Sequence, residues 1–388
     1  MGRIIFLSFV LAFFSCGERI ESQPRNATNK IVGGAFEHRG WMLEGMPGNL
    51  NEIDTSAAWK QTKDRLVISG RVYDRAGKKP MAGVIIYYYH TNADGRYEHD
   101  AHLKVSMAPK AGQTHGALRG WVKTNEKGEY AIYTGRPAPY PGRSFPAHIH
   151  LTLKEPNEIG DYYLDDIVFD DDRLVNTAYR KAMENRGGSG VVRLTKRGNV
   201  SVGTRNIYVG LNIPDHPDNR MESGSGPEVG EDVLSFTPFH AWGKDKGTRA
   251  CPVCKYGRYY GILYFVGNHP GWQEVKTWLL YFEQLSTEYD TTLKVYMVYG
   301  SEIDYDPNQR KIELSQLGKE LNIQKVALTY VPSFKDTITD IDFLQIKPEF
   351  SNTILVYYRS TVIAKYVNQK HNLKVLEDIR AFINYDYR

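Results

Sequence analysis

Short runs of β-branched and aromatic residues, separated by turn residues, fill the chain from about residue 61 to residue 215. One run, 84–90, reads Val-Ile-Ile-Tyr-Tyr-Tyr-His, and turns are indicated at Gly77 to Pro80 and at Asp94-Gly95. Closely spaced short strands of this kind predict a β-sandwich. The expected strands are 66–74, 84–90, 120–124, 130–134, 148–153 and 206–211.

The pattern changes after 216–248, a stretch rich in Pro, Gly, Asp, Glu and Ser that we expect to be a linker. In the region 249–388 an apolar run at 260–266 is followed by helical spacing over 272–289 and a second apolar run at 293–299. Further elements are expected at 309–322 (helix), 325–330, 353–358 and 361–367 (strands) and 373–384 (helix). This order predicts a mixed α/β domain.

The N-terminus has the pattern of an export signal. Arg3 precedes an apolar run of about 11 residues, whereas a membrane-spanning helix needs about 20. Ser15-Cys16 resembles the cleavage motif of bacterial lipoproteins, which implies that 1–15 is removed and that Cys16 carries lipid; the alternative is an ordinary signal peptide with an incidental cysteine. We expect 16–60 to be a tether, and the protein to lie in the bacterial cell envelope, anchored to a membrane, or otherwise to be secreted.

Composition narrows the class of protein. The 388 residues carry 49 Lys+Arg against 45 Asp+Glu and are 41% hydrophobic, which fits a soluble chain of two domains. The net charge of +4 is too weak for a nucleic-acid binder. The 27 tyrosines suit strands, binding surfaces or metal ligation by phenolate.

Three cysteines occur in the chain. If Cys16 carries lipid, Cys251 and Cys254 can close a disulfide in an oxidising compartment. Haem attachment is excluded because Lys255, not His, follows the pair, and a zinc site would need more ligands than nearby His240 supplies.

His148-Ile149-His150 lies within an expected strand. Residues i and i+2 of a strand project from the same face, so the two imidazoles can bind one metal ion. The alternative is a pair of half-buried structural histidines. The acidic pairs near Asp165-Asp166 are interpreted as solvated turns rather than a calcium site. His99, His102 and His115 are interpreted as solvated loop histidines, one of which could face a substrate.

The neighbouring motifs share an order with one known family. They are Gly70 in the first strand, Asp94-Gly95-x-Tyr97, Arg119-Gly120 with Thr124, Gly128-x-Tyr130, Pro139-Tyr140-Pro141, Pro146-Ala147-His148-Ile149-His150 and a later acidic segment at 163–172. Residues 66–153 thereby resemble the intradiol ring-cleavage dioxygenases, which include protocatechuate and catechol dioxygenases.

The resemblance implies an Fe(III) ion held by Tyr97, Tyr140, His148 and His150. A phenol of pKa near 10 is mostly protonated in water, but a cation at bonding distance makes the phenolate stable. Two phenolates suit a hard trivalent ion, and two imidazoles complete an N/O shell.

The resemblance also implies an activity: opening of a catechol-type ring between its two hydroxyl carbons with O₂. Tyr140 would leave the metal and help to remove the second substrate proton, and Arg143 matches a family arginine. Phe145 stands where the family usually has another arginine, three residues before the first histidine. This difference fits a bulkier or uncharged catechol, and it makes metal binding better supported than catalysis.

The element order of 249–388 resembles the thioredoxin-like fold. That fold places C-x-x-C after its first core strand, where this chain has Asn268 to Gly271, and Cys251 and Cys254 come before the strand. We therefore expect a structural disulfide or a module that binds an envelope partner. Two alternatives stay open: a non-catalytic β-sandwich binding module coupled to this domain, and a thiol-disulfide protein.

Overall fold

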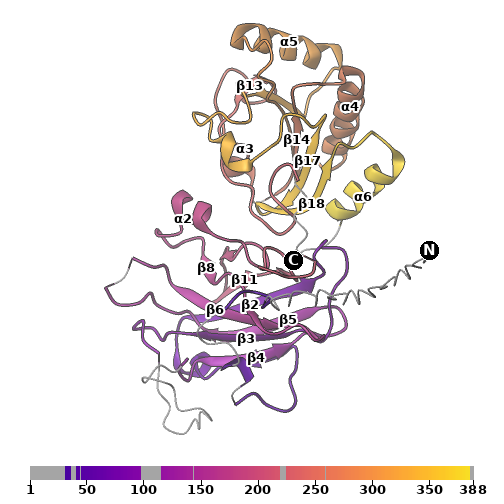
Figure 1. The fold of residues 1–388 in the computed structure, drawn as a ribbon. Helices are drawn as coiled ribbons and strands as arrows, with labels where there is room; N and C mark the ends of the chain where they lie inside the picture. The colour runs from indigo at the N-terminus through magenta and orange to yellow at the C-terminus, as the bar shows by residue number, and fades with distance from the viewer. Residues whose placement is uncertain are drawn as a thin grey trace, which may run out of the picture.

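The computed structural model describes residues 31–35, 41–43, 45–97, 115–142, 144–218, 224–257 and 259–384. Within these ranges the chain forms a β-rich domain followed by an α/β domain (Figure 1). The expected signal segment 1–15, the expected lipid site Cys16, Arg143, His99 and His102 lie outside the described residues. No helix in these ranges combines the length and the apolar character that crossing a membrane requires.

Two sheets make up the N-terminal domain. The first has the order β1 (Ile53–Thr55), β5 (Glu129–Gly135), β2 (Arg65–Tyr73), β11 (Val200–Thr204), β10 (Thr195–Arg197), and β12 (Ile207–Tyr208) also pairs with β2. The second has the order β4 (Arg119–Lys123), β3 (Ile85–His90), β6 (His148–Lys154), β8 (Ile167–Phe169), β9 (Val191–Val192), and β7 (Tyr162–Tyr163) pairs with β6.

The inner faces of these sheets share one core. Alternate residues of β2 and β6, such as Leu66, Ile68, Ile149 and Leu151, are fully buried in it. Strand periodicity places every second side chain on one face, so the intervening residues of β6 face away from this core. The β-sandwich expected from the sequence is therefore the architecture of this domain.

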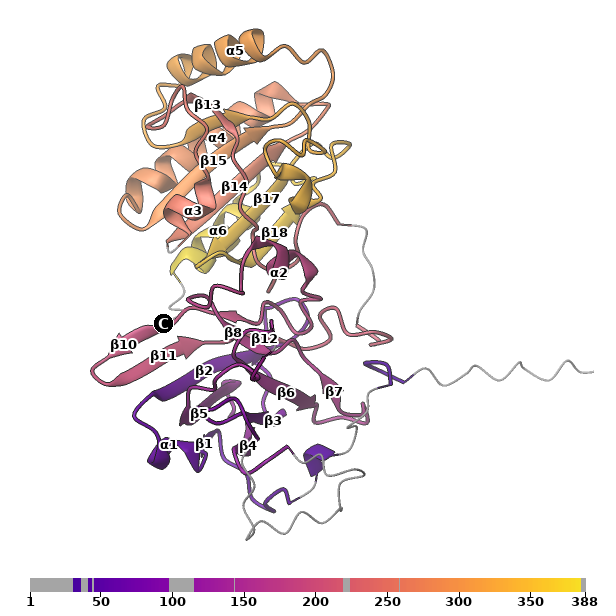
Figure 2. The same ribbon diagram turned by 90° about the vertical axis from the view of Figure 1, so that its left-hand side faces the viewer.

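Short helical segments lie at the edges of the N-terminal domain: η1 (Trp41–Leu43), α1 (Ala58–Gln61) and α2 (Thr177–Ala182). The side chain of Asn176 accepts a hydrogen bond from the backbone N–H of Tyr179 and caps α2. This helix lies on the side of the domain that faces the C-terminal domain (Figure 1 and Figure 2).

The C-terminal domain has one mixed sheet. Its order is β13 (Phe239–Trp242), β16 (Ala327–Tyr330), β15 (Leu293–Tyr299), β14 (Tyr260–Val266), β17 (Thr353–Tyr358), β18 (Thr361–Val367). The buried faces of α4 (Trp272–Glu288), α5 (Pro307–Glu320) and α6 (Leu373–Asn384) belong to the core on one side of the sheet. The core on the other side includes residues of α3 (Pro252–Tyr256) and η3 (Ile341–Leu344). The domain is thus α/β, as expected, while its thioredoxin likeness stays a prediction.

Two expected boundaries are wrong. The tether was expected to reach residue 60, but β1 pairs in parallel with β5, so the N-terminal domain begins before residue 61. The linker was expected to fill 216–248, but β13 pairs with β16, and Val233 and Phe236 are buried in the core of the C-terminal domain. Few but well-spaced apolar residues hold this polar segment in place, and composition alone did not reveal them.

Candidate metal centre

His148 and His150 lie on the outer face of β6, opposite the core residues Ile149 and Leu151. On one side β6 pairs with β3, where Tyr89 is the partner of His150. On the other side it pairs with β8 in antiparallel register, with His148 opposite Val168 and Ile149 opposite Ile167. The register therefore brings Asp166, the residue before β8, beside His150.

The hydrogen bonds of the two imidazoles fix which nitrogen each one presents to the centre. His148 Nδ1 lies 2.8 Å from the carbonyl oxygen of Pro146, and His150 Nδ1 lies 2.9 Å from Asp166 Oδ1. Carbonyl and carboxylate oxygens only accept, so both Nδ1 atoms carry the proton. In the neutral rings both Nε2 atoms then present lone pairs.

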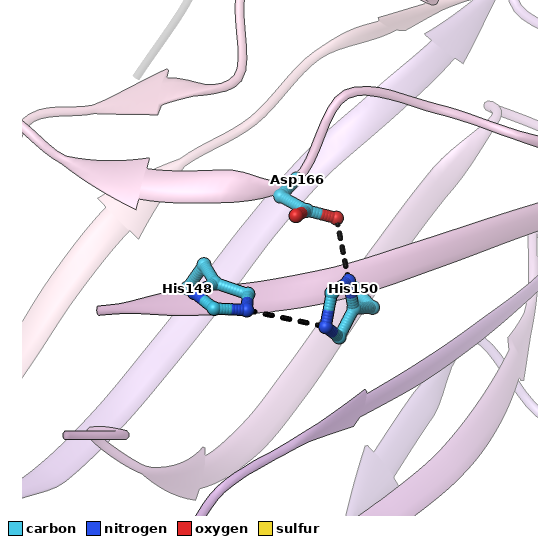
Figure 3. Close-up of side chains that lie close together, drawn as sticks. All are labelled: His148, His150 and Asp166. Carbon is cyan, nitrogen blue, oxygen red and sulfur yellow. Dashed lines mark hydrogen bonds and ion pairs between the residues drawn. The ribbon is translucent and has the colours of Figure 1, made fainter. Parts of the chain in front are cut away.

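Those two Nε2 atoms lie 3.1 Å apart (Figure 3). Two lone pairs at this distance repel unless a proton or a cation lies between them. Burial, and then the neighbouring His150, lower the pKa of His148 below its ordinary value, which favours the neutral ring. A cation bound between the two nitrogens would satisfy both lone pairs at once.

Asp166 holds His150 in this orientation. Burial alone would raise the pKa of the Asp166 carboxyl, but the attraction of His150 and its hydrogen bond outweigh burial and lower that pKa. The carboxylate is therefore ionised at neutral pH. His148, His150 and Asp166 offer atoms within 4.8 Å of one another, yet Asp166 contacts the nitrogen that points away from the centre. A carboxylate in this place fixes the tautomer and the ring plane of a metal-binding histidine.

Two loops bring the tyrosines to the same place. The turn at 92–96 precedes Tyr97, and the backbone N–H of Ala138 donates to the carbonyl of Asn92, which joins this turn to the loop that carries Tyr140. Gly95 has φ +73°, and a Cβ atom there would lie 2.0 Å from the carbonyl oxygen of Pro139. Only glycine permits this approach of the two loops.

The four polar tips converge. The hydroxyl oxygens of Tyr97 and Tyr140 lie 2.5 Å apart, and the Tyr140 hydroxyl lies 3.2 Å from His150 Nε2. Burial, and then the hydrogen bond with Tyr140, raise the pKa of Tyr97 above its usual range, so in the absence of a cation this phenol stays protonated. The structure thus brings together all four residues expected to bind metal.

These residues fit a ferric ion. Ligand atoms bound at about 2 Å from one metal ion lie roughly 3 Å from each other, as the nitrogen and oxygen atoms do here. Two phenol oxygens, which become anionic beside a cation, and two imidazole nitrogens form an N/O donor set without thiolate. Such a set suits a hard trivalent ion better than a soft one.

An aromatic stack supports the centre from the side of β3. The ring centroid of Tyr89 lies 4.5 Å from that of His150. The ring of His115 also stacks on Tyr89, with centroids 3.7 Å apart and an interplanar angle of 2°. His115 Nδ1 is also 2.9 Å from the hydroxyl of Tyr87. The interpretation of His115 as a solvated loop residue is wrong: it is 6% exposed and packs in this stack.

Two further expectations have outcomes here. Asp165 and Asp166 do not form a solvated turn, because Asp165 accepts hydrogen bonds from the backbone N–H groups of Asn185 and Arg186, and Asp166 holds His150. Asp166 was missed as a site residue because only the register of β6 and β8 places it there. Phe145 is 58% exposed and supplies no cation to the centre.

Cys251 and Cys254 are joined by a disulfide at the start of α3. The backbone N–H of Cys254 donates to Cys251 Sγ, and Val253 packs into the core of the C-terminal domain. The disulfide and its partner residues belong to that domain and contribute no atom to the metal centre.

Comparison with known proteins agrees with this geometry for the N-terminal region. The family model described as Dioxygenase matches residues 49–187. The beta chain of protocatechuate 3,4-dioxygenase from Burkholderia cepacia is 35% identical over 107 residues, which are 26% of this chain and 40% of that protein. The chain thus spans well under half of the length of this curated relative. The N-terminal region is thus similar in sequence to the intradiol dioxygenases.

Solved structures of dioxygenases are also similar to part of the chain. The dioxygenase domain of a dioxygenase and carbohydrate-binding fusion from Streptomyces sp. SirexAA-E is 20% identical, with a TM-score of 0.30, over 43% of this chain and 96% of that one. Hydroxyquinol 1,2-dioxygenase from Pseudomonas putida DLL-E4 is 20% identical, with a TM-score of 0.32, over 48% of this chain and 68% of that one.

Proposed function

We propose that the N-terminal domain is a non-haem Fe(III) dioxygenase that opens a catechol-type ring between its two hydroxyl carbons with O₂. We also propose that the protein is exported to the bacterial cell envelope, anchored by lipid on Cys16, with the α/β domain as a module for an envelope partner. The observation that carries the enzymatic proposal is the pair of Nε2 atoms 3.1 Å apart with two phenol oxygens beside them.

In this centre Tyr97, Tyr140, His148 and His150 would hold the iron. A bound Fe(III) ion supplies Lewis acidity and a template for the two oxygens of a catechol. Asp166 keeps the proton of His150 on Nδ1, so that Nε2 stays available as a ligand. Tyr89 limits rotation of the same ring by stacking on it.

Tyr140 is placed to handle a substrate proton. The Tyr140 hydroxyl lies 2.5 Å from the hydroxyl of Tyr97 and 3.2 Å from His150 Nε2. As a phenolate, this oxygen can accept the proton of a substrate hydroxyl that reaches the centre, because catalytic proton transfer needs contact at hydrogen-bond distance. The Tyr140 phenol formed in this way stays within hydrogen-bond distance of the Tyr97 hydroxyl and of His150 Nε2.

The choice of substrate is narrowed by Phe145. This exposed ring lies three residues before His148, and it offers an apolar surface and no positive charge. A catechol that carries a carboxylate would find no partner in this side chain. We therefore propose a neutral or bulky catechol as the substrate.

The first test is optical. Protein loaded with iron is expected to bind one ion and to show a visible phenolate-to-iron charge-transfer band. Tyr97→Phe and Tyr140→Phe should each shift or remove the band, because each deletes one phenolate. Tyr133→Phe is the matched control: this tyrosine of β5 packs edge-on against Trp59 and should leave the band unchanged.

Oxygen uptake with a panel of catechols then separates catalysis from binding. Consumption of O₂ with a neutral catechol, lost in Tyr140→Phe, is the expected result. A coloured protein that binds catechols without consuming oxygen would instead identify a non-catalytic binding module. A colourless protein without iron would refute the metal centre itself.

A further inference from the structure

A second cavity, distinct from the metal centre, opens between the two domains. This interdomain cleft has a volume of about 840 Å³ and is lined by both domains and by the segment that joins them. Five of its lining side chains are cationic: Arg180 of α2, Arg193, Arg205, Lys255 of α3 and Arg359 in the turn between β17 and β18.

The cleft also contains two carboxylates, and both are engaged. Asp170 accepts from Arg193 Nε at 2.9 Å. Asp232 accepts from Ser189 Oγ at 2.8 Å and from Arg180 at 3.3 Å. Lys255 is also paired, with Asp245 at 2.7 Å. Arg205 and Arg359 then have no ion pair among the described residues, so positive charge exceeds negative charge in the cavity.

Three arginines of the cleft have N–H donors that make no hydrogen bond with the described residues. Arg193 is about half exposed, and its contact with Asp170 is made through Nε. Arg359 is exposed and has no ion pair among the described residues of the chain. Arg205 is 2% exposed; two of its nitrogens donate to the carbonyls of Ser189 and Arg186, while its buried Nε has no hydrogen-bond partner in the described ranges.

We propose that the interdomain cleft binds a small anion with paired anionic oxygens, such as a dicarboxylate or a phosphate. Guanidinium groups present several N–H donors in one plane and match such oxygens. Cavities at the junction of two domains are preferred places for small ligands. The ligand would contact Arg193 from the β-rich domain or Arg359 from the α/β domain, both of which line the cleft, and the buried Arg205 would add positive charge to the lining.

This site is independent of iron and does not rest on the proposed dioxygenase function. The cationic residues come from α2, α3, the β17–β18 turn and segments after β9 and β11, none of which carries a ligand of the metal centre. Loss of iron should therefore leave the anion site intact. Failure of one proposal would leave the other standing.

Calorimetric titration of the full-length protein with inorganic phosphate and with succinate tests the proposal. We expect saturable binding of at least one anion, weakened by added salt because the contacts are ionic. At least one of Arg193→Gln and Arg359→Gln should weaken it by about tenfold. Arg380→Gln is the matched control, since this arginine pairs with Glu288 outside the cleft and should leave binding unchanged.

The outcomes are distinct. Tighter binding of succinate assigns the site to dicarboxylates, and tighter binding of phosphate assigns it to phosphate-bearing molecules. Binding that is equally strong in both cleft variants and the control, or no saturable binding up to about 10 mM of either anion, would overturn the proposal. Circular dichroism and the melting temperature of each variant establish that it is folded, so that loss of binding reports on the site.

Discussion

At the scale of single residues, the candidate metal centre depends on which nitrogen each histidine presents. Pro146 and Asp166 each occupy an Nδ1 atom as acceptors, and this leaves both Nε2 atoms facing each other. The same two contacts make the imidazoles preorganised ligands, because neither ring has to turn or to change tautomer when a cation enters. Preorganisation of this kind raises affinity by lowering the cost of binding.

Replacing Asp166 tests this role. In Asp166→Asn the uncharged amide holds His150 less firmly and lowers the basicity of its Nε2. We expect iron affinity, measured by competition with a chelator, to fall about 10- to 100-fold. Asp165→Asn is the control, because Asp165 accepts hydrogen bonds from the backbone N–H groups of Asn185 and Arg186, away from the imidazoles, and its replacement should leave the affinity unchanged. Equal affinity in Asp166→Asn and wild type would contradict the role given to Asp166.

The convergence of the four candidate ligand residues could be predicted from the sequence, and their supporting residues could not. Tyr97, Tyr140, His148 and His150 stand in short motifs that resemble those of one family, and the structure brings their polar tips together. Asp166 lies in an acidic stretch that looks solvated until the register of β6 and β8 is known. His115 follows a segment of no clear pattern, and its place in the stack on Tyr89 depends on tertiary packing.

At the scale of elements, the buried carboxylate of Glu155 links the end of β6 to two later segments of the chain. Glu155 follows β6 and accepts hydrogen bonds at 2.8 Å from the hydroxyl of Tyr162 in β7 and from Nε2 of His216. The side chains of Glu155 and His216 are almost completely buried. Because β6 also carries His148 and His150, this contact helps to hold the strand that positions the metal centre.

The pH dependence of stability follows from this contact. Burial alone would raise the pKa of Glu155, but the hydrogen bonds from His216, Tyr162 and Asn157 outweigh it and hold that pKa below its ordinary value of 4.5. A carboxyl with a lowered pKa in the folded state stabilises the fold above about pH 4.5, and that contribution disappears as the pH falls through the folded value.

We therefore expect Glu155→Gln to lower the free energy of unfolding by about 2 kcal/mol at neutral pH. The difference from wild type should shrink as the pH falls through the lowered pKa of Glu155, because wild-type Glu155 then also becomes neutral. Urea denaturation at neutral pH and at acidic pH measures this difference in the free energy of unfolding. Glu158→Gln, at an exposed position, is the control. A difference that stays constant or grows at low pH would refute this assignment.

Elements with strong periodicity could be predicted closely. The apolar runs at 260–266 and 293–299 coincide with β14 and β15. The pair β10 and β11 was missed, because Thr195–Arg197 is wholly exposed and the whole segment is rich in polar and small residues. Its pairing partner in the core sheet is β2, far away in sequence, and such long-range pairing leaves no local pattern.

At the scale of the whole molecule, the segment before β13 makes hydrogen bonds with both domains. The backbone N–H of Ser189 donates to the carbonyl of Gly230, and the N–H of Gly230 donates to that of Val362. Asp232 adds contacts with Arg180 and Ser189 on one side and with Thr361 on the other. A composition of Pro, Gly and acidic residues indicated a linker, but it could not show that its polar groups would have partners on both domains.

Asp232 is the residue through which this connection can be tested. Asp232→Ala removes acceptors from Arg180, Ser189 and Thr361 together, and we expect it to weaken the coupling of the domains by about 2 kcal/mol. In differential scanning calorimetry the wild type should unfold in one transition and the variant in two, one for each domain. Asp290→Ala is the control, because Asp290 pairs with Lys325 within the C-terminal domain and should leave a single transition. If Asp232→Ala unfolds in a single transition, and its melting temperature shifts no more than that of the control, other contacts join the domains.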